Sequence, residues 1–212
     1  MRRFAASVVG KLLIFFAQFI TAARAEWRGI EPVRRQRIYY ANHTSNADLP
    51  LIWTVLPAAL RRDTRAVAAA DYWLKNKLRA FVGRDVFRAV LIDRRPEHRT
   101  DDPIAKIVEA LDEGSSIIIF PEGGRNRSED PLMPFKAGLY NIATQRPEID
   151  LVPCWIDNIS HIMPSGEVIP VPLACTVVFG SAIHVEDGEP KDKFLTRASD
   201  ALLQLIPQRG HA

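Results

Sequence analysis

The sequence predicts an α/β fold, in which helices flank a layered, largely parallel mixed sheet. Short apolar runs of strand length, such as residues 117–119, alternate along the chain with longer segments whose apolar residues have helical spacing. The chain has 212 residues, 47% hydrophobic and 25% charged, which suits one domain with a real core. An additional apolar stretch, residues 4–23, is expected to form an N-terminal membrane-associating helix.

The first half of the domain is expected to contain, in order, a strand at 37–41, a helix at 48–60, a strand at 66–70, a helix at 72–82 and a strand at 86–92. Residues 44–46 offer polar side chains that can cap the first of these helices. Asp71 and Gly83 bracket the second, as a cap and a stop.

The second half is expected to contain a helix at 103–113, a strand at 117–120, a helix at 136–145, strands at 151–156 and 173–179, and a helix at 191–206. The helix at 103–113 is the best marked. Pro103 occupies its first position, Ile104, Ile107, Val108 and Leu111 repeat at helical spacing, and Gly114 ends it.

Several interpretations of residues 4–23 compete, and one of them is a helix docked on the core of the domain. Arg2 and Arg3, an apolar run and a small-x-small site at residues 23–25 fit a cleaved secretory signal. The length is near the minimum for a transmembrane helix, with Lys11 inside it. A helix lying within one leaflet would instead place basic residues at anionic lipid heads. The division expected is therefore an apolar segment, 1–26, and a globular domain, 27–212.

Composition excludes several functional classes. The net charge is +3, and the 28 basic residues comprise 21 Arg and 7 Lys, a bias that favours phosphate-bearing partners. No nucleic-acid-binding pattern accompanies this charge, so no nucleic acid partner is expected. Cys154 and Cys175 lie far apart and are expected to be core residues of a reduced protein. No metal-ligand spacing is present.

The turn that follows residues 117–119 carries candidate chemistry. Pro121 stops the strand, Gly123 and Gly124 allow left-handed backbone and close approach of a ligand, and Glu122 and Arg125 remain at the strand's carboxyl end. Open α/β sheets bind their ligands at that edge. We therefore expect a binding site here.

A second candidate is His43 with Asp48, placed where a strand ends and a helix begins. A carboxylate on one imidazole nitrogen fixes the tautomer and leaves the other free to take a proton from a hydroxyl, as a general base. No Gly-x-Ser-x-Gly, zinc or nucleotide-binding motif offers another catalytic logic. A base without a protein nucleophile implies that the substrates supply both a hydroxyl and an activated electrophile.

These residues resemble conserved blocks of the glycerolipid acyltransferases, the 1-acylglycerol-3-phosphate acyltransferase family. Asn42-His43-x4-Asp48 and Phe120-Pro121-Glu122-Gly123-x-Arg125 have the family's order, and residues 90–94 and 151–154 look like two further blocks. Phe135-Lys136-x-Gly138 resembles the helix start that follows the glycine turn. The resemblance covers residues 27–179.

The resemblance implies an O-acyltransferase of phospholipid biosynthesis, which moves a fatty acyl group directly from acyl-CoA or acyl-carrier protein, the co-substrate, to a lysophospholipid hydroxyl. It implies no further cofactor. His43 and Asp48 would be catalytic. The acceptor would be bound by the remaining matched residues, Arg94, Glu122, Gly123, Gly124, Arg125 and Lys136. A basic group at Arg61, Arg62 and Arg65 would suit either donor.

One departure from the family's sequence pattern leaves the identity of the acceptor lipid undecided. Gly124 stands where the family usually has Thr or Ser, so a lyso-ornithine lipid or another amino lipid is an alternative to 1-acylglycerol-3-phosphate. A non-catalytic lysolipid-binding protein of the same fold is a second alternative, and a secreted hydrolase a third. Because thioester donors are cytosolic, we expect attachment to the cytoplasmic face of the cell membrane, anchored or peripheral through the N-terminal helix.

Overall fold

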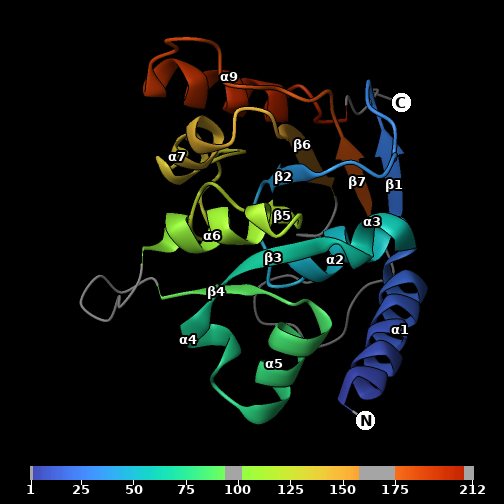
Figure 1. Cartoon of the computed structure of the whole chain (residues 1–212). Helices are drawn as coiled ribbons and strands as arrows, with labels where there is room; N and C mark the ends of the chain where they lie inside the picture. Colours follow the sequence, from blue (N-terminus) through green and yellow to red (C-terminus); the bar gives the residue numbers. More distant parts are fainter. Residues whose placement is uncertain (1, 94–101, 158–174, 208–212) are drawn as a thin grey trace, which may run out of the picture.

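One mixed sheet separates two layers of helices in the computed structural model (Figure 1). The structure describes residues 2–93, 102–157 and 175–207, without the side chains of residues 16–21. Its elements, in chain order, are α1 (Arg2–Thr21), β1 (Arg24–Trp27), β2 (Arg37–Ala41), α2 (Asp48–Val55), α3 (Ala58–Arg62), β3 (Thr64–Ala69), α4 (Ala70–Trp73), α5 (Lys77–Phe81), the π-helix η1 (Val82–Val86), β4 (Val90–Ile92), α6 (Pro103–Asp112), β5 (Ser116–Ile119), α7 (Gly138–Gln145), β6 (Asp150–Asp157), β7 (Thr176–Phe179) and α9 (Lys191–Leu203).

The seven strands described have the order β1-β7-β6-β2-β5-β3-β4. The five strands from β6 to β4 are parallel to their neighbours, whereas β7 runs antiparallel to β6 and β1 pairs parallel with β7. The predicted α/β class with a largely parallel mixed sheet is confirmed. The expected boundary between residues 26 and 27 falls inside β1, a strand that the sequence pattern did not reveal.

Alternating strand residues build two apolar cores, one on each face of the sheet. Tyr39 and Ala41 of β2 face the core shared with α1, α2 and η1, while Ile38 and Tyr40 face the core shared with α6, α7 and α9. The helix after β2 and the helix after β5 therefore lie on opposite faces, although the two strands are neighbours. Such a switch point opens a crevice at the carboxyl ends of the strands.

Two predicted helices differ in the structure. The helix expected at 48–60 is broken into α2 and α3 because Leu56, the residue before Pro57, is extended with ψ 135°. The helix expected at 72–82 is divided into α4 and α5, and Asn76 caps the second through a bond to the Arg79 N–H. Part of the strand expected at 86–92 belongs to η1, so β4 is only three residues long.

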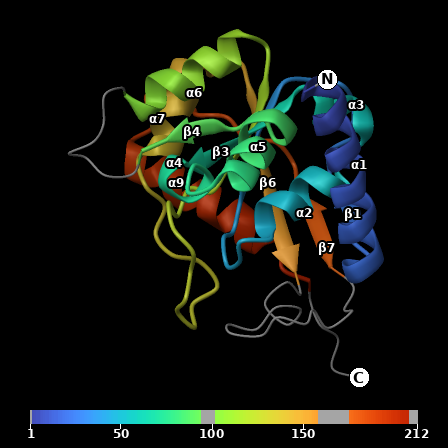
Figure 2. The same ribbon diagram turned by 90° about the horizontal axis from the view of Figure 1, so that it is seen from below.

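The helix expected near the N-terminus is present as α1, which packs against α2 and η1. Its expected apolar character is not supported for the helix as a whole, because α1 begins with Arg2 and Arg3 and contains Lys11 inside the apolar run. Among the residues described, no helix combines the length and apolarity that crossing a membrane requires. Figure 2, seen from below, shows α1 and α5 toward the viewer, at the end of the molecule that carries the N-terminus.

Candidate active site

A cavity of about 610 Å³ lies at the carboxyl edge of the parallel strands. Residues at or just beyond the ends of four strands line it: His43 after β2, Ala69 in β3, Ile92 in β4 and Phe120 after β5. This is the edge at which the switch point between β2 and β5 predicts a ligand. The cavity therefore brings together two loops that are almost 80 residues apart in the sequence.

The lining combines an apolar wall with a few polar groups, as binding sites for small molecules usually do. The apolar part comes from the strands β3 to β5 and from α6 and α7, and includes Val67, Ile92, Ile104, Ile107, Ile119 and Leu139. Its polar groups include His43, Asn46, Arg125, Lys136 and Asn141. A ligand with a long apolar chain and an anionic head would match this distribution.

His43 is held by a buried carboxylate. Its Nδ1 lies 2.8 Å from Oδ2 of Asp48, whose side chain is fully buried at the start of α2. The same oxygen accepts the backbone N–H groups of Thr44 and Ser45 at 2.7 and 2.8 Å. This oxygen therefore accepts a hydrogen bond from the Nδ1–H group, which leaves Nε2 to act as the base. The ring also stacks on Phe120 at 4.3 Å between centroids, so the loop after β5 fixes its plane.

The buried side chain of Glu122 connects the loop after β5 to the loop after β2. One carboxylate oxygen accepts the His43 backbone N–H at 2.8 Å, and the other accepts the Met133 N–H at 2.8 Å. The carboxylate is almost completely buried, and this burial raises its pKa despite the two N–H groups that favour the charged form. In return, the Asn126 N–H donates to the His43 carbonyl at 2.6 Å. The backbone of His43 is thus held at both its N–H and its carbonyl by the loop after β5.

The two glycines of the turn, Gly123 and Gly124, have different surroundings. Gly123 has φ +70°, and a Cβ there would lie 2.8 Å from Cδ of Lys136, so the lysine side chain crosses the glycine backbone. A larger residue at 123 would displace Lys136 as well as strain the turn. Gly124 differs, because a Cβ at that position would meet no heavy atom within 4 Å. The turn therefore has open space at position 124, where the glycerolipid acyltransferases that the sequence resembles usually have Thr or Ser.

The structure brings most of the predicted site residues to one place. His43, Gly123, Gly124, Arg125 and Lys136 line the cavity. Asp48 lies buried behind His43, and Glu122 lies buried between the loops. Arg94 lies outside the described residues. The basic group at Arg61, Arg62 and Arg65 lies around the start of β3, at the sheet edge opposite the cavity.

The sequence pattern did not reveal that Asn126 organises the loop after β5. Its buried side chain donates to the Asp130 carbonyl at 2.8 Å and accepts from Ser128, which folds the segment that follows Arg125. Only the presence of a turn-forming asparagine could have indicated this.

The comparison with protein families gives a match to an acyltransferase model over residues 24–157, which is more than half of the chain. The chain belongs to the acyltransferase family. The matched residues include His43, Asp48 and the entire glycine turn. The cavity that we describe is thus enclosed largely by the family's own segment.

Two curated relatives are similar in sequence to this member of the acyltransferase family, both at low identity. A 1-acyl-sn-glycerol-3-phosphate acyltransferase of Cocos nucifera is 28% identical over 165 residues, covering 76% of this chain and 50% of the relative. The enzyme of the same name from Limnanthes douglasii is 24% identical over 206 residues, covering 94% of this chain and 68% of the relative. This acyltransferase-family chain thus spans about half the length of the coconut protein.

A solved structure shares the fold. The crystal structure of the 1-acyl-sn-glycerophosphate acyltransferase from Thermotoga maritima matches with a TM-score of 0.70 at 20% sequence identity, covering 97% of this chain and 81% of that one. The sheet order and the flanking helices of this acyltransferase-family chain therefore belong to a known architecture.

Proposed function

We propose that this protein is an O-acyltransferase that moves a fatty acyl group from an acyl thioester, acyl-CoA or acyl-carrier protein, to the free hydroxyl of a lysophospholipid. The acceptor we favour is 1-acylglycerol-3-phosphate, which gives phosphatidic acid in phospholipid biosynthesis. One observation carries the proposal: the imidazole of His43, held by buried Asp48, lines a cavity that also contains Arg125 and Lys136. The names of the curated relatives agree with this acceptor.

The reaction requires no covalent enzyme intermediate. Nε2 of His43 takes the proton of the acceptor hydroxyl as its oxygen attacks the thioester carbonyl carbon. The tetrahedral intermediate collapses, the C–S bond breaks, and the imidazolium returns the proton to the departing thiolate. Asp48 stabilises the transient imidazolium through Nδ1, in the way a buried carboxylate orients a catalytic histidine.

The acceptor head would bind to the cationic residues of the cavity. The planar fork of Arg125 would make bidentate contacts to a phosphate, and Lys136 would supply a second charge above Gly123. The apolar wall from α6 and β5 would take an acyl chain. Arg94 remains a candidate for a further phosphate contact.

The direct test is a panel of lysolipids, each incubated with one acyl-CoA and scored by release of free thiol. We expect the fastest release with 1-acylglycerol-3-phosphate, because only this head engages both cations fully. Extraction of lysolipid without thiol release would instead identify a non-catalytic lysolipid-binding protein. Release of fatty acid without an acceptor would identify a hydrolase.

A phosphate-free acceptor is the second candidate, and the space beside Gly124 favours it. The position has no neighbour within 4 Å of a Cβ, which leaves room for a head bulkier than phosphate. A lyso-ornithine lipid has such a head. Faster thiol release with this lipid than with 1-acylglycerol-3-phosphate, in the same panel, would select this candidate.

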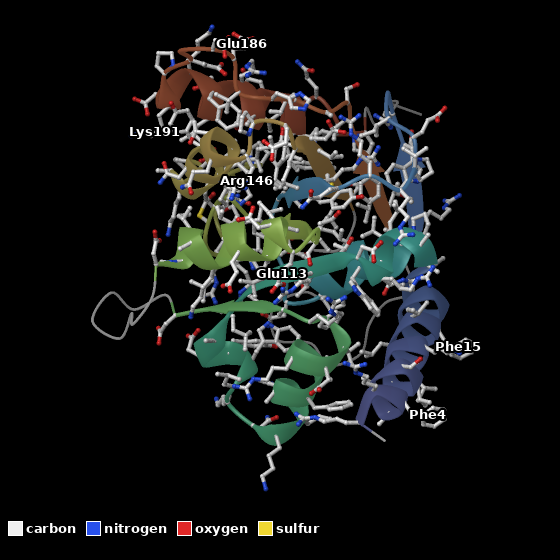
Figure 3. The ribbon with its side chains drawn as sticks, viewed as in Figure 1. Phe4, Phe15, Glu113, Arg146, Glu186 and Lys191 are labelled. Atoms are coloured by element: carbon white, nitrogen blue, oxygen red, sulfur yellow. The ribbon has the colours of Figure 1, made fainter. Side chains whose placement is uncertain are left out.

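We also propose that the protein attaches to the cytoplasmic face of the cell membrane through α1. Its outer face carries Phe4, Leu12 and Phe15, which are 76%, 60% and 68% exposed, at helical spacing. Figure 3 shows Phe4 and Phe15 pointing away from the body of the molecule. A helix with this exposed apolar stripe suits insertion into one leaflet.

Replacing Phe4 and Phe15 together by serine is expected to move the full-length protein from the membrane fraction to the soluble fraction, because each ring contributes apolar area to the leaflet. Immunoblotting of the separated fractions measures this. A double variant that stays in the membrane fraction would contradict the attachment through α1. A mature wild-type chain beginning at Glu26 would indicate a cleaved signal instead.

A further inference from the structure

The segment between β3 and β4 exposes two leucines. Leu78 of α5 is 72% exposed, and Leu74, which precedes α5, is 41% exposed. Of the eight large hydrophobic side chains that are exposed in the described part of the chain, six lie on this segment or on α1: Phe4, Val8, Leu12, Phe15, Leu74 and Leu78. Exposed apolar groups that gather in this way mark an interaction surface rather than scattered surface residues.

This segment and α1 lie at the same end of the molecule. The π-helix η1 continues directly from α5 and packs against α1. Arg2 at the start of α1 is bonded to Asp85 of η1 at 3.1 Å, which ties the two elements together. Both ribbon views show α1 and α5 together at this end, and Figure 1 shows α9 at the opposite end.

The charge of this surface indicates an anionic occupant. Residues 2–21 and 70–86 together hold seven basic and two acidic residues, whereas the whole chain has 28 basic and 25 acidic residues. The rest of the chain therefore has more acidic than basic residues. Lys75 and Lys77 lie between Leu74 and Leu78 in the sequence and are exposed. A second copy of the chain meeting the same surface would bring like charges together, which disfavours a dimer here.

We propose that the segment from α4 to α5 is a second membrane contact, in which Leu74 and Leu78 enter an anionic leaflet and Lys75 and Lys77 bind its headgroups. This deepens the proposed function and rests on it, since it assumes a lipid acceptor. Tyr72 and Trp73 of α4 line the cavity that contains His43. Docking of this segment therefore holds the cavity wall at the bilayer, where an acceptor can leave the leaflet without crossing water.

The contact is tested with the full-length protein by co-sedimentation with vesicles. Vesicles of phosphatidylcholine with phosphatidylglycerol are compared with vesicles of phosphatidylcholine alone. Leu78→Ser is expected to weaken binding to both by about tenfold. The double variant Lys75→Gln/Lys77→Gln is expected to weaken binding to the anionic vesicles alone, by about tenfold to 30-fold.

Matched controls lie elsewhere on the surface. Val33→Ser removes a side chain that is 49% exposed, and Lys191→Gln/Lys193→Gln neutralises two exposed lysines of α9, the helix at the opposite end. Both controls are expected to bind vesicles like the wild type. Thiol release with a short-chain, water-soluble acceptor is expected to be unchanged in all four variants, which shows that they are folded.

Several outcomes would overturn the proposal. Wild-type vesicle binding by both α5 variants, or equal losses in the controls, would remove the contact. Conversion of a lipid-free dimer to a monomer by Leu78→Ser would assign the surface to a second copy. Because vesicle binding does not depend on catalysis, failure of the lysolipid panel with loss of binding in the α5 variants would reject the proposed function alone.

Discussion

Replacing His43 by alanine is expected to lower kcat for acyl transfer by about 10³-fold, within the range that general-base catalysis contributes. The imidazole is the group that can accept the hydroxyl proton, and water cannot take its place in the fixed orientation that Asp48 imposes. The His43 side chain is 21% exposed and not part of the apolar core, so the fold is expected to persist. Thiol release from acyl-CoA with 1-acylglycerol-3-phosphate measures the effect.

The chain provides its own control for this substitution. His184 also pairs with a buried carboxylate, through Nε2 at 3.0 Å from Oδ1 of Asp150, but it does not line the cavity. His184→Ala is expected to keep kcat within about twofold of the wild type, because it removes a histidine–aspartate pair without removing the base. Turnover by His43→Ala within tenfold of the wild type would contradict the proposed mechanism.

The pairing of His43 with Asp48 could be predicted because it is local. A strand end followed by a helix start brings residues five positions apart within hydrogen-bond range, and the structure has their nitrogen and oxygen 2.8 Å apart. The parallel strands could also be predicted, since buried apolar runs alternate with helical segments. Both conclusions depend on patterns shorter than about 15 residues, for which local sequence is informative.

The partner of Glu122 could not be predicted in this way. The strand end predicts a binding site near this acid, and the family resemblance implies contact with the acceptor. In the structure its oxygens accept the backbone N–H groups of His43 and Met133. The bond to His43 spans 79 residues and depends on β2 and β5 being neighbours. Strand order is a property of the whole sheet, and no short pattern carries it. For the same reason, no short pattern could place Arg61, Arg62 and Arg65 around the start of β3, at the edge opposite the cavity.

The break in the helix expected at 72–82 has a similar origin, whereas the break in the helix expected at 48–60 is local, at Leu56 and Pro57. Trp73 packs against Gly83, where a Cβ would lie 3.0 Å from the ring, and this contact folds α4 back toward η1. Asp71 and Gly83 predicted one helix over residues 72–82, and this local pattern does not reveal the contact between Trp73 and Gly83. Tertiary packing thus decided a segment whose local pattern favoured one continuous helix.

Glu122→Gln is expected to produce the second large effect, a decrease in kcat of about tenfold to 100-fold with KM nearly unchanged. An amide has one acceptor oxygen, whereas Glu122 accepts two backbone N–H groups. In the variant, either His43 or Met133 would face an NH2 group, and a buried donor without a partner costs about 1–3 kcal/mol. His43 would then be less firmly placed, while the cavity cations that bind the acceptor would remain.

A matched variant distinguishes a loss of kcat that comes from misplacing His43 from one that comes only from lower stability. Glu189 is also almost completely buried, and it accepts the Glu186 N–H and pairs with Arg197 at 2.6 Å, outside the cavity. Glu189→Gln is expected to lower the melting temperature without lowering kcat at a temperature where both variants are folded. An equal decrease in kcat in the two variants would show that Glu122 acts only through stability.

The pH dependence of stability separates the two carboxyl groups further. Burial raises the pKa of Glu122, so the folded protein binds more protons here than the unfolded chain, and this contribution to stability declines as pH rises from the usual carboxyl pKa through the raised one. Arg197 lowers the pKa of Glu189, so its contribution has the opposite sign and is lost as pH falls. Glu122→Gln should therefore steepen the rise of stability with pH in the acidic range, whereas Glu189→Gln should flatten it. Denaturant unfolding at several pH values measures both slopes, and a slope unchanged by Glu122→Gln would mean that its carboxylate is not buried in the working protein.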